Sequence, residues 1–318
     1  MAARGGGAGL GRVGMLLATA LAPATWGTTY LVTTEMLPAD RPLLVAGVRA
    51  LPAGLLLVAL SRRLPSGVWW WRSLVLGMLN VGLFFPLIFA GAYRLPGGVA
   101  STIGAVSPLL VVGLSFLIGG VRPQARVLLA GVGGVVGVGL LVLGSQARID
   151  PIGVGLMLVA TALMATGVVM SARWGRPEGV SLLATTGWQL TVGGTVIVPL
   201  MFAVEGMPPV PTGRNLLGFG YLVLIATALA YVLWFRGIER LGADAASFLG
   251  LVNPLVATFA GLLILSQTPA PLQVLGLVIA LGAMLLGRGP ARARKLADAV
   301  EPVRVVNEPN RSTVAKVS

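Results

Sequence analysis

The sequence predicts an all-α integral membrane protein of ten transmembrane helices, built as two inverted five-helix repeats. Three observations carry this prediction: an apolar composition, ten apolar runs long enough to cross a membrane, and a similarity between the two halves of the chain. Of the 318 residues, 56% are hydrophobic and 10% are charged, whereas average soluble domains have about 45–50% and about 25%. A soluble protein of this size could not bury so much apolar surface, so a lipid bilayer is the expected environment.

Ten apolar runs have the length that a membrane helix needs, since a hydrocarbon core about 30 Å thick requires about 20 helical residues. The predicted spans, in chain order, are 13–34, 42–61, 73–93, 97–119, 127–145, 152–172, 180–204, 215–236, 243–265 and 272–288. They leave no room for a soluble domain. The polar, mixed-charge segment 289–318 is predicted to be a disordered cytoplasmic tail.

Residues 1–12 are predicted to form a short cytoplasmic N-terminus. Arg4, Arg12 and the apolar residues after them are also typical of a cleaved signal peptide. Because the apolar run continues through Tyr30, which is longer than such a peptide usually extends, we predict a first membrane helix instead.

The basic residues predict how the chain is oriented. If the N-terminus is cytoplasmic, only Arg41, Arg94, Arg148 and Arg214 lie on the opposite side, and Arg49 lies inside a span. All the other arginines and lysines then lie on the cytoplasmic side, as expected for loops that stay in the cytoplasm. This asymmetry predicts a multi-pass protein of the bacterial inner (plasma) membrane with both termini in the cytoplasm.

The two halves of the chain resemble each other in sequence. Residues 94–109 align without a gap with residues 240–255, and Arg, Leu, Ala, Ser, Gly, Val, Pro and Leu coincide. Each half has an odd number of spans, so 13–145 would form a first repeat and 152–288 a second repeat of opposite orientation. Inverted repeats are typical of secondary transporters. The alternative is an old duplication without moving parts, as in a channel or a membrane enzyme.

Several short motifs connect this layout with a known family. They are Trp26-Gly27-Thr-Thr-Tyr30, Arg49, Gly220-Tyr-Leu, Ala228-Leu-Ala-Tyr231-Val-Leu-Trp234-Phe235-Arg236, Leu241-Gly-Ala243 and Asn253-Pro254-Leu255. These motifs resemble those of the EamA family in the drug/metabolite transporter superfamily, and the resemblance covers residues 12–288. It implies a ten-helix metabolite exporter. The chain departs from the family pattern at Gly120 and Gln267, where a glutamate is common, and at Met164, where an aromatic residue is usual.

Polar or aromatic side chains inside a span are costly in lipid and therefore mark a candidate substrate path. The predicted substrate-binding residues are Trp26, Tyr30, Arg49, Asn80, Ser107, Trp188, Gln189, Tyr231, Trp234 and Asn253, and the predicted helix kinks are Pro108 and Pro254. The two prolines are expected to border a central cavity formed mainly by the third, fourth, eighth and ninth spans, with the first, second, sixth and seventh contributing. The alternatives are that the prolines only bend helices for packing and that the aromatic residues belong to interfacial belts.

Arg49 is the clearest charge inside a span, and the repeat places Gln189 at the equivalent position. It either anchors an anion, such as a substrate carboxylate, or snorkels to the outer interface. No acidic residue lies well inside a span; Glu35, Glu239 and Asp244 lie at span ends. The sequence therefore predicts substrate-driven exchange or facilitated export in place of proton coupling.

The absence of cysteine and histidine excludes disulfides, metal sites built from these residues, and cysteine or histidine catalysis. Paired acidic motifs and nucleotide-binding elements are absent from the sequence as well. We therefore expect no enzyme activity, no cofactor and no metal. The net charge of +13 comes from loops between apolar runs, which indicates membrane orientation and no nucleic-acid partner.

Together the residues and the resemblance predict a secondary transporter of small metabolites that uses alternating access, with efflux of amino acids or related compounds as the implied activity. The alternative is a passive channel or facilitator for small polar solutes, which would not accumulate its solute against a gradient. The expected partners are a small-molecule substrate and the lipid bilayer, with a homodimer as an open alternative.

Overall fold

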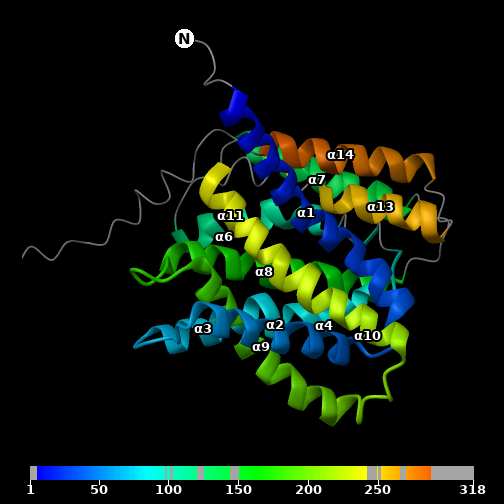
Figure 1. The fold of residues 1–318 in the computed structure, drawn as a ribbon. Coiled ribbons are helices and arrows are strands. Elements are labelled where there is room, and N and C mark those ends of the chain that lie inside the picture. The colour runs from blue at the N-terminus through cyan, green and yellow to red at the C-terminus, as the bar shows by residue number, and fades with distance from the viewer. Residues whose placement is uncertain are drawn as a thin grey trace, which may run out of the picture. The chain divides into compact units, whose positions relative to one another are not determined.

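The structure is a computed structural model, and its described ranges form helices joined by loops (Figure 1). These ranges are residues 6–96, 99–100, 103–119, 125–143, 150–241, 249, 252–265 and 270–287. The helices of the first half are α1 (Gly6–Met36), α2 (Pro42–Ser61), α3 (Trp69–Gly77), α4 (Phe84–Ala92), α6 (Ser107–Gly119) and α7 (Ala125–Leu143). Those of the second half are α8 (Pro151–Trp174), α9 (Leu182–Val204), α10 (Gly213–Gly220), α11 (Ala230–Leu241), α13 (Val252–Leu265) and α14 (Pro271–Gly287).

Five helical stretches are long and apolar enough to cross a membrane. They are Pro42–Ser61, Trp69–Ala92, Pro151–Ser171, Leu182–Val204 and Gly213–Trp234. They confirm the second, third, sixth, seventh and eighth predicted spans, with ends that differ by a few residues. The helices α1, α6, α7, α13 and α14 overlap the other five predicted spans, and α1, α7 and α14 begin a few residues before them. The ten-helix, two-repeat arrangement itself stays a prediction.

The helix starts follow local sequence signals. Proline, which lacks the N–H that a first turn leaves unpaired, occupies the first position of α2, α8 and α14. Asp150 caps α8 by accepting from the Ile152 backbone N–H at 2.8 Å. Ser181 caps α9 in the same way through the Ala184 N–H.

Two π-helical segments interrupt long helices, and the sequence did not predict them. The segment η1 (Met78–Gly82) joins α3 to α4, and η3 (Tyr221–Leu229) joins α10 to α11. In the register that aligns Arg94 with Arg240, Asn80 of η1 falls on Ala226 of η3. The two π segments therefore occupy equivalent positions in the two halves of the chain. Such π segments are frequent at functional sites.

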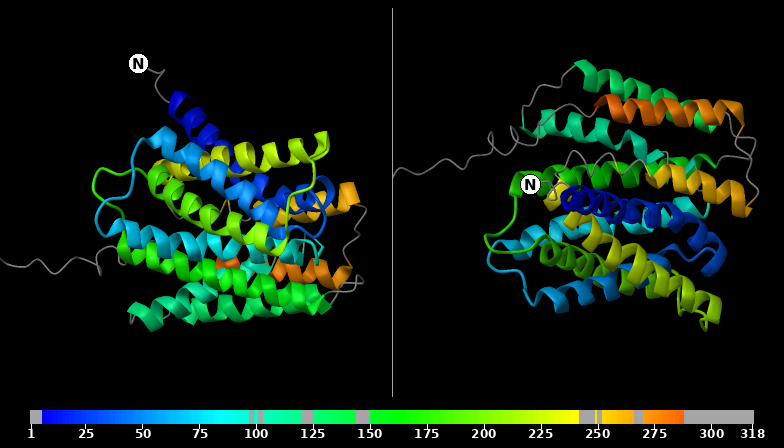
Figure 2. Two further views of the ribbon diagram at one scale, coloured as in Figure 1. Left: turned by 90° about the horizontal axis from the view of Figure 1, so that it is seen from below. Right: turned by 45° about the horizontal axis from the view of Figure 1, so that its top comes forward.

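The helix pairings run across the two halves of the chain. α2 packs against α9, and α7 packs against α14, as two views agree (Figure 1, Figure 2). α1 packs against α11 and α13, while α8 packs against α4 and α6. In the predicted span numbering, the first helix contacts the eighth and ninth, and the sixth contacts the third and fourth. Each of these contacts therefore has a counterpart when the halves are exchanged.

Glycines bring α2 and α9 into close contact. A Cβ added at Gly54 would lie 2.5 Å from the Thr191 backbone nitrogen, and one at Gly194 would lie 2.7 Å from the Leu51 Cα. In the register that aligns Arg49 with Gln189, Gly54 falls on Gly194. Small residues at a helix contact let two backbones approach closely in a membrane. The largest cluster of buried apolar side chains surrounds this contact and includes side chains of α4 and η3.

Candidate functional site

The centre of the candidate site is Arg49 on α2. Its side chain is 7% exposed. Its Nε donates to Thr227 Oγ1 at 2.9 Å, and its Nη2 donates to the Ala226 carbonyl oxygen at 3.4 Å. The guanidinium carbon lies 4.9 Å from the ring centroid of Phe85 and 5.7 Å from that of Phe89. The side chain therefore lies inside the bundle, between η3 and the aromatic face of α4.

Aromatic residues predicted from the sequence gather next to this arginine. The Trp26 indole Nε1 donates to the same Ala226 carbonyl oxygen at 2.9 Å. The Trp26 ring centroid lies 5.7 Å from that of Tyr231 and 5.3 Å from that of Trp234. The indole of α1 and the guanidinium of α2 thus converge on one backbone oxygen of η3, beside two aromatic side chains of α11.

Tyr30, one turn after Trp26 on α1, is also buried, at 8% exposed. Sequence reasoning missed several neighbours of this group. Thr28 Oγ1 and the Tyr221 hydroxyl share a hydrogen bond of 2.5 Å between α1 and η3. Thr227, which receives the Arg49 bond, was missed as well. The sequence could have indicated Thr227, because it is a polar residue next to Ala226 and the repeat aligns Ala226 with Asn80.

A second polar contact joins two other predicted residues. Asn80 Nδ2 of η1 donates to Gln189 Oε1 of α9 at 2.8 Å. Asn80 Oδ1 is buried without a hydrogen-bond partner, and Gly167 of α8 lies against it so closely that a Cβ there would overlap the amide. The structure therefore brings Asn80 and Gln189 together, in a separate contact from Arg49.

Trp188 belongs to a different environment, although it precedes Gln189. Its Nε1 donates to the Arg63 carbonyl oxygen at 2.7 Å, and its ring lies 6.5 Å from Trp69. Nearby, the Arg72 guanidinium lies over the rings of Trp69 and Trp174, at 5.1 and 5.7 Å. These contacts link α3, α8 and α9 at the end of the bundle that was predicted to be cytoplasmic.

The predicted kink helices contribute less to the described site. Ser107 begins α6 and Asn253 lies in the first turn of α13, and both are half-buried. Asn253 Oδ1 is buried without a hydrogen-bond partner, and its backbone oxygen approaches Gly27 of α1. Pro108 and Pro254 are helical, but their side chains lie outside the described residues. Gly120, Gln267 and Asp244 also lie outside them, as does the side chain of Glu239.

Glu205, at the end of α9, makes contacts that the sequence did not predict. Its carboxylate accepts from the Leu43 and Leu44 backbone N–H groups, at 2.6 and 2.9 Å. Arg41 Nη1 donates to the Glu205 carbonyl oxygen at 2.6 Å. The carboxylate thus caps α2, which has no side-chain cap of its own, and a negative charge stabilises a helix N-terminus.

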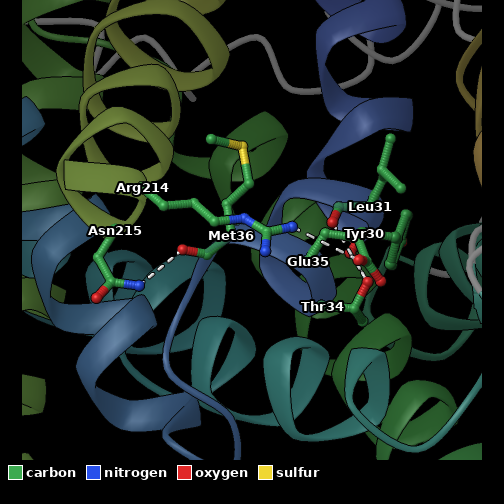
Figure 3. A network of polar contacts seen from close by, with 7 residues as sticks. All are labelled: Tyr30, Leu31, Thr34, Glu35, Met36, Arg214 and Asn215. Carbon is green, nitrogen blue, oxygen red and sulfur yellow. Dashed lines mark hydrogen bonds and ion pairs between the residues drawn. The ribbon is translucent and has the colours of Figure 1, made fainter. Parts of the chain in front are cut away.

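Two ion pairs of the described residues lie at the same end of the bundle. Arg214 lies 3.7 Å from Glu35, and Asn215 donates to the Met36 carbonyl oxygen at 2.9 Å (Figure 3). Arg94 lies 2.6 Å from Asp150, and its hydrogen bond lowers the pKa of that carboxyl group. The arginines of both pairs and Arg41 are residues that were predicted to be periplasmic.

Comparisons with known proteins agree with this architecture. The model of the EamA-like transporter family matches the chain twice, at residues 12–143 and 151–287. Protein PecM of Dickeya dadantii is 44% identical over 265 residues, which cover 83% of this chain and 89% of PecM. The uncharacterized inner membrane transporter YedA of Escherichia coli is 26% identical and covers 82% of this chain and 86% of its own length.

One solved protein structure matches the fold with a TM-score of 0.61, over 89% of this chain and 99% of its own length. At 20% identity this likeness shows the fold alone. The relatives and the apolar helices identify a multi-pass membrane protein, and the resemblance found in the sequence is confirmed. The chain belongs to the EamA-like transporter family.

Proposed function

We propose that the chain is a secondary transporter of small metabolites across the bacterial inner membrane, working by alternating access of two inverted repeats. Export of amino acids or related compounds is the activity that we expect. The observation that carries this proposal is a pair of polar contacts at equivalent positions of the two halves, the buried contact of Arg49 with η3 and the part-buried contact of Gln189 with η1. Secondary transporters place their substrate sites between repeats, near the middle of the membrane.

The helix contacts support the same mechanism. The glycine contacts of α2 with α9 are related by exchange of the halves, as are the pairings of α1 and α8. Two halves with the same contacts in opposite orientation can exchange an outward-open shape for an inward-open one at little cost in free energy. The contacts at one end would then break while those at the other form.

Two sets of contacts would form these alternating closures. At the end that we propose to be periplasmic, Glu205 holds α2, and Arg94 pairs with Asp150. At the end that we propose to be cytoplasmic, Trp188 bonds to the Arg63 carbonyl oxygen and Arg72 lies on Trp174. This orientation follows the arginine asymmetry, and both termini would be cytoplasmic. Reporter fusions at Ser318 that are active only in the periplasm would contradict it.

The decisive experiment is counterflow in proteoliposomes that contain the full chain. Vesicles loaded with unlabelled amino acids, sugars or cationic drugs are diluted into a trace of the labelled compound. An alternating-access transporter gives a transient accumulation of label, whereas a passive channel gives only equilibration. The proposal would be contradicted if no compound enters the proteoliposomes faster than it enters protein-free vesicles.

Cross-linking tests the alternating closures directly, because the chain has no cysteine of its own. Arg94→Cys and Asp150→Cys together allow a bifunctional thiol reagent to lock one end. We expect the locked protein to lose counterflow and to regain it when a cleavable linker is cut. Each single cysteine variant is the matched control, and retained counterflow in the locked protein would contradict the mechanism.

A further inference from the structure

We propose that Arg49 binds a carboxylate group of the transported substrate, so that the substrates are small organic carboxylates with an apolar part. This inference rests on the proposed transport function and specifies its substrate class. It is carried by the charge of Arg49, by the quality of its present hydrogen bonds, and by the neutral contact in the other half of the chain.

The charge of Arg49 has no neutralising partner in the described part of the chain. The ion pairs found there are Arg94 with Asp150 and Arg214 with Glu35, and both lie at helix ends. The printed contacts of its side chain are with neutral groups: the Thr227 hydroxyl, the Ala226 carbonyl oxygen and the rings of Phe85 and Phe89. A guanidinium keeps its charge in proteins, and a buried charge is costly unless an opposite charge pairs with it.

One of the hydrogen bonds that Arg49 donates is long, so a stronger acceptor could replace its present one. Its Nη2 is 3.4 Å from the Ala226 carbonyl oxygen, which is longer than the usual range of about 2.7–3.2 Å. That oxygen already accepts a 2.9 Å bond from Trp26. A carboxylate would offer two charged oxygens to the planar guanidinium, and such bidentate bonds are about twice as strong as neutral ones. The substrate would therefore displace Arg49 Nη2 from η3 and leave Trp26 in place.

The surroundings of Arg49 fit an apolar substrate body. Phe85 and Phe89 lie on one side of the guanidinium. Trp26, which shares the Ala226 oxygen, packs with Tyr231 and Trp234. A ligand whose carboxylate meets Arg49 would have these rings as its neighbours, and aromatic rings favour contact with apolar or planar groups.

In the other half of the chain, a neutral side chain makes the equivalent contact. Gln189, at the position equivalent to Arg49, reaches η1 through a neutral hydrogen bond to Asn80. The same kind of contact between a long helix and a π segment is thus made with amide groups alone. A positive charge in only one half therefore points to a ligand and not to a packing requirement.

The test compares acids with their primary amides on the full wild-type chain in proteoliposomes. A panel of amino acids, alkyl carboxylates and aryl carboxylates, such as phenylacetate beside phenylacetamide, competes in the counterflow assay and is titrated by calorimetry in detergent. We expect the acids to bind at least tenfold more tightly than the matched amides. Equal binding of acids and amides, or binding of neither, would overturn the proposal.

Two substitutions localise the effect. Arg49→Gln reproduces the neutral side chain of the other half, and we expect it to remove the preference for acids; Arg49→Lys keeps the charge and should keep part of the preference. Arg176→Gln, an exposed arginine in a loop, is the matched control and should behave as the wild type. An unchanged acid preference in Arg49→Gln would overturn the inference.

The outcomes separate this inference from the proposed function. Counterflow of neutral compounds that is unaffected by Arg49→Gln would leave the transport function standing and overturn the carboxylate site. Binding of acids that depends on Arg49 without any counterflow would support the site and contradict the transport function. If Arg49→Gln does not fold, the acid and amide comparison on the wild-type chain still decides.

Discussion

Arg49 and Gln189 occupy equivalent positions in the sequence repeat, and each reaches a π segment on the opposite half of the chain. Arg49 donates to Thr227 and Ala226 of η3, whereas Gln189 accepts from Asn80 of η1. The backbone contacts around them also correspond, because Gly54 meets Thr191 and Gly194 meets Leu51. The two halves therefore share a packing arrangement but differ in charge at its centre. The proposed binding of a substrate carboxylate by Arg49 would account for this difference, because one carboxylate needs one charged partner.

The largest loss of stability is expected at the glycine contacts between α2 and α9, which the two halves share. Gly54→Leu and Gly194→Leu each place side-chain atoms where the partner helix already stands, at Thr191 and Leu51. We expect each variant to lose at least about 3 kcal/mol of unfolding free energy, the upper part of the range for overpacking, or to fail to accumulate. The measurement is an SDS titration of the purified chain in mixed micelles.

Gly155→Leu on α8 is the matched control, since a Cβ there meets no atom within 4 Å. A large loss for only one of Gly54→Leu and Gly194→Leu would break the correspondence between the halves.

The second-largest loss of stability is expected at the hydrogen bond from Arg49 to Thr227. Thr227→Val keeps the shape of the side chain but removes the acceptor of Arg49 Nε. Hydrogen bonds to charged groups contribute about 1.5–3 kcal/mol, so we expect a loss in unfolding free energy of this size in the same titration. Thr227→Ser, which retains the hydroxyl, should lose clearly less; equal losses for the two variants would contradict the role of the hydroxyl.

The neutral contact should contribute less. A double-mutant cycle with Asn80→Leu and Gln189→Leu measures the coupling of the 2.8 Å bond between them. We expect about 0.5–1.5 kcal/mol, the usual net contribution of a neutral hydrogen bond. A coupling as large as that between Arg49 and Thr227, measured by the same cycle, would remove the distinction between the halves.

The smallest effect is expected far from both central contacts, at the exposed pair of Arg94 and Asp150. The hydrogen bond from Arg94 lowers the pKa of the Asp150 carboxyl group below its ordinary 3.8 in the folded protein. The pair therefore stabilises the fold above the unfolded pKa, and this contribution is lost as the pH falls through the folded pKa. Solvent screening keeps it small.

The measurement is the apparent melting temperature of the wild type and of Asp150→Asn between pH 7 and pH 2. The wild type should melt slightly higher at pH 7, and the difference should disappear in acid. Glu178→Gln, at an exposed loop position, is the control. A difference that persists unchanged to the lowest pH would show that the charge of Asp150 contributes nothing.

The sequence predicted the class of protein, the family and the places of five spans that the structure confirms. Hydropathy decides whether a segment of about 20 residues enters a membrane, and this is a property of each segment by itself. Pro42 and Pro151 at helix starts, and Asp150 and Ser181 as caps, are likewise local. The aromatic and polar residues of the candidate site were predicted because such side chains are costly in lipid, whatever their neighbours.

The partners of those residues were decided only by the tertiary structure. Which side of α2 faces η3 depends on how the helices rotate and pack, so the bond from Arg49 to Thr227 could not be read from residue types. Trp188 and Gln189 are adjacent in sequence, yet they point to different contacts, because successive residues of a helix lie about 100° apart around its axis. Glu205 was missed for the same reason: its function as the cap of α2 exists only where the end of α9 meets the start of α2.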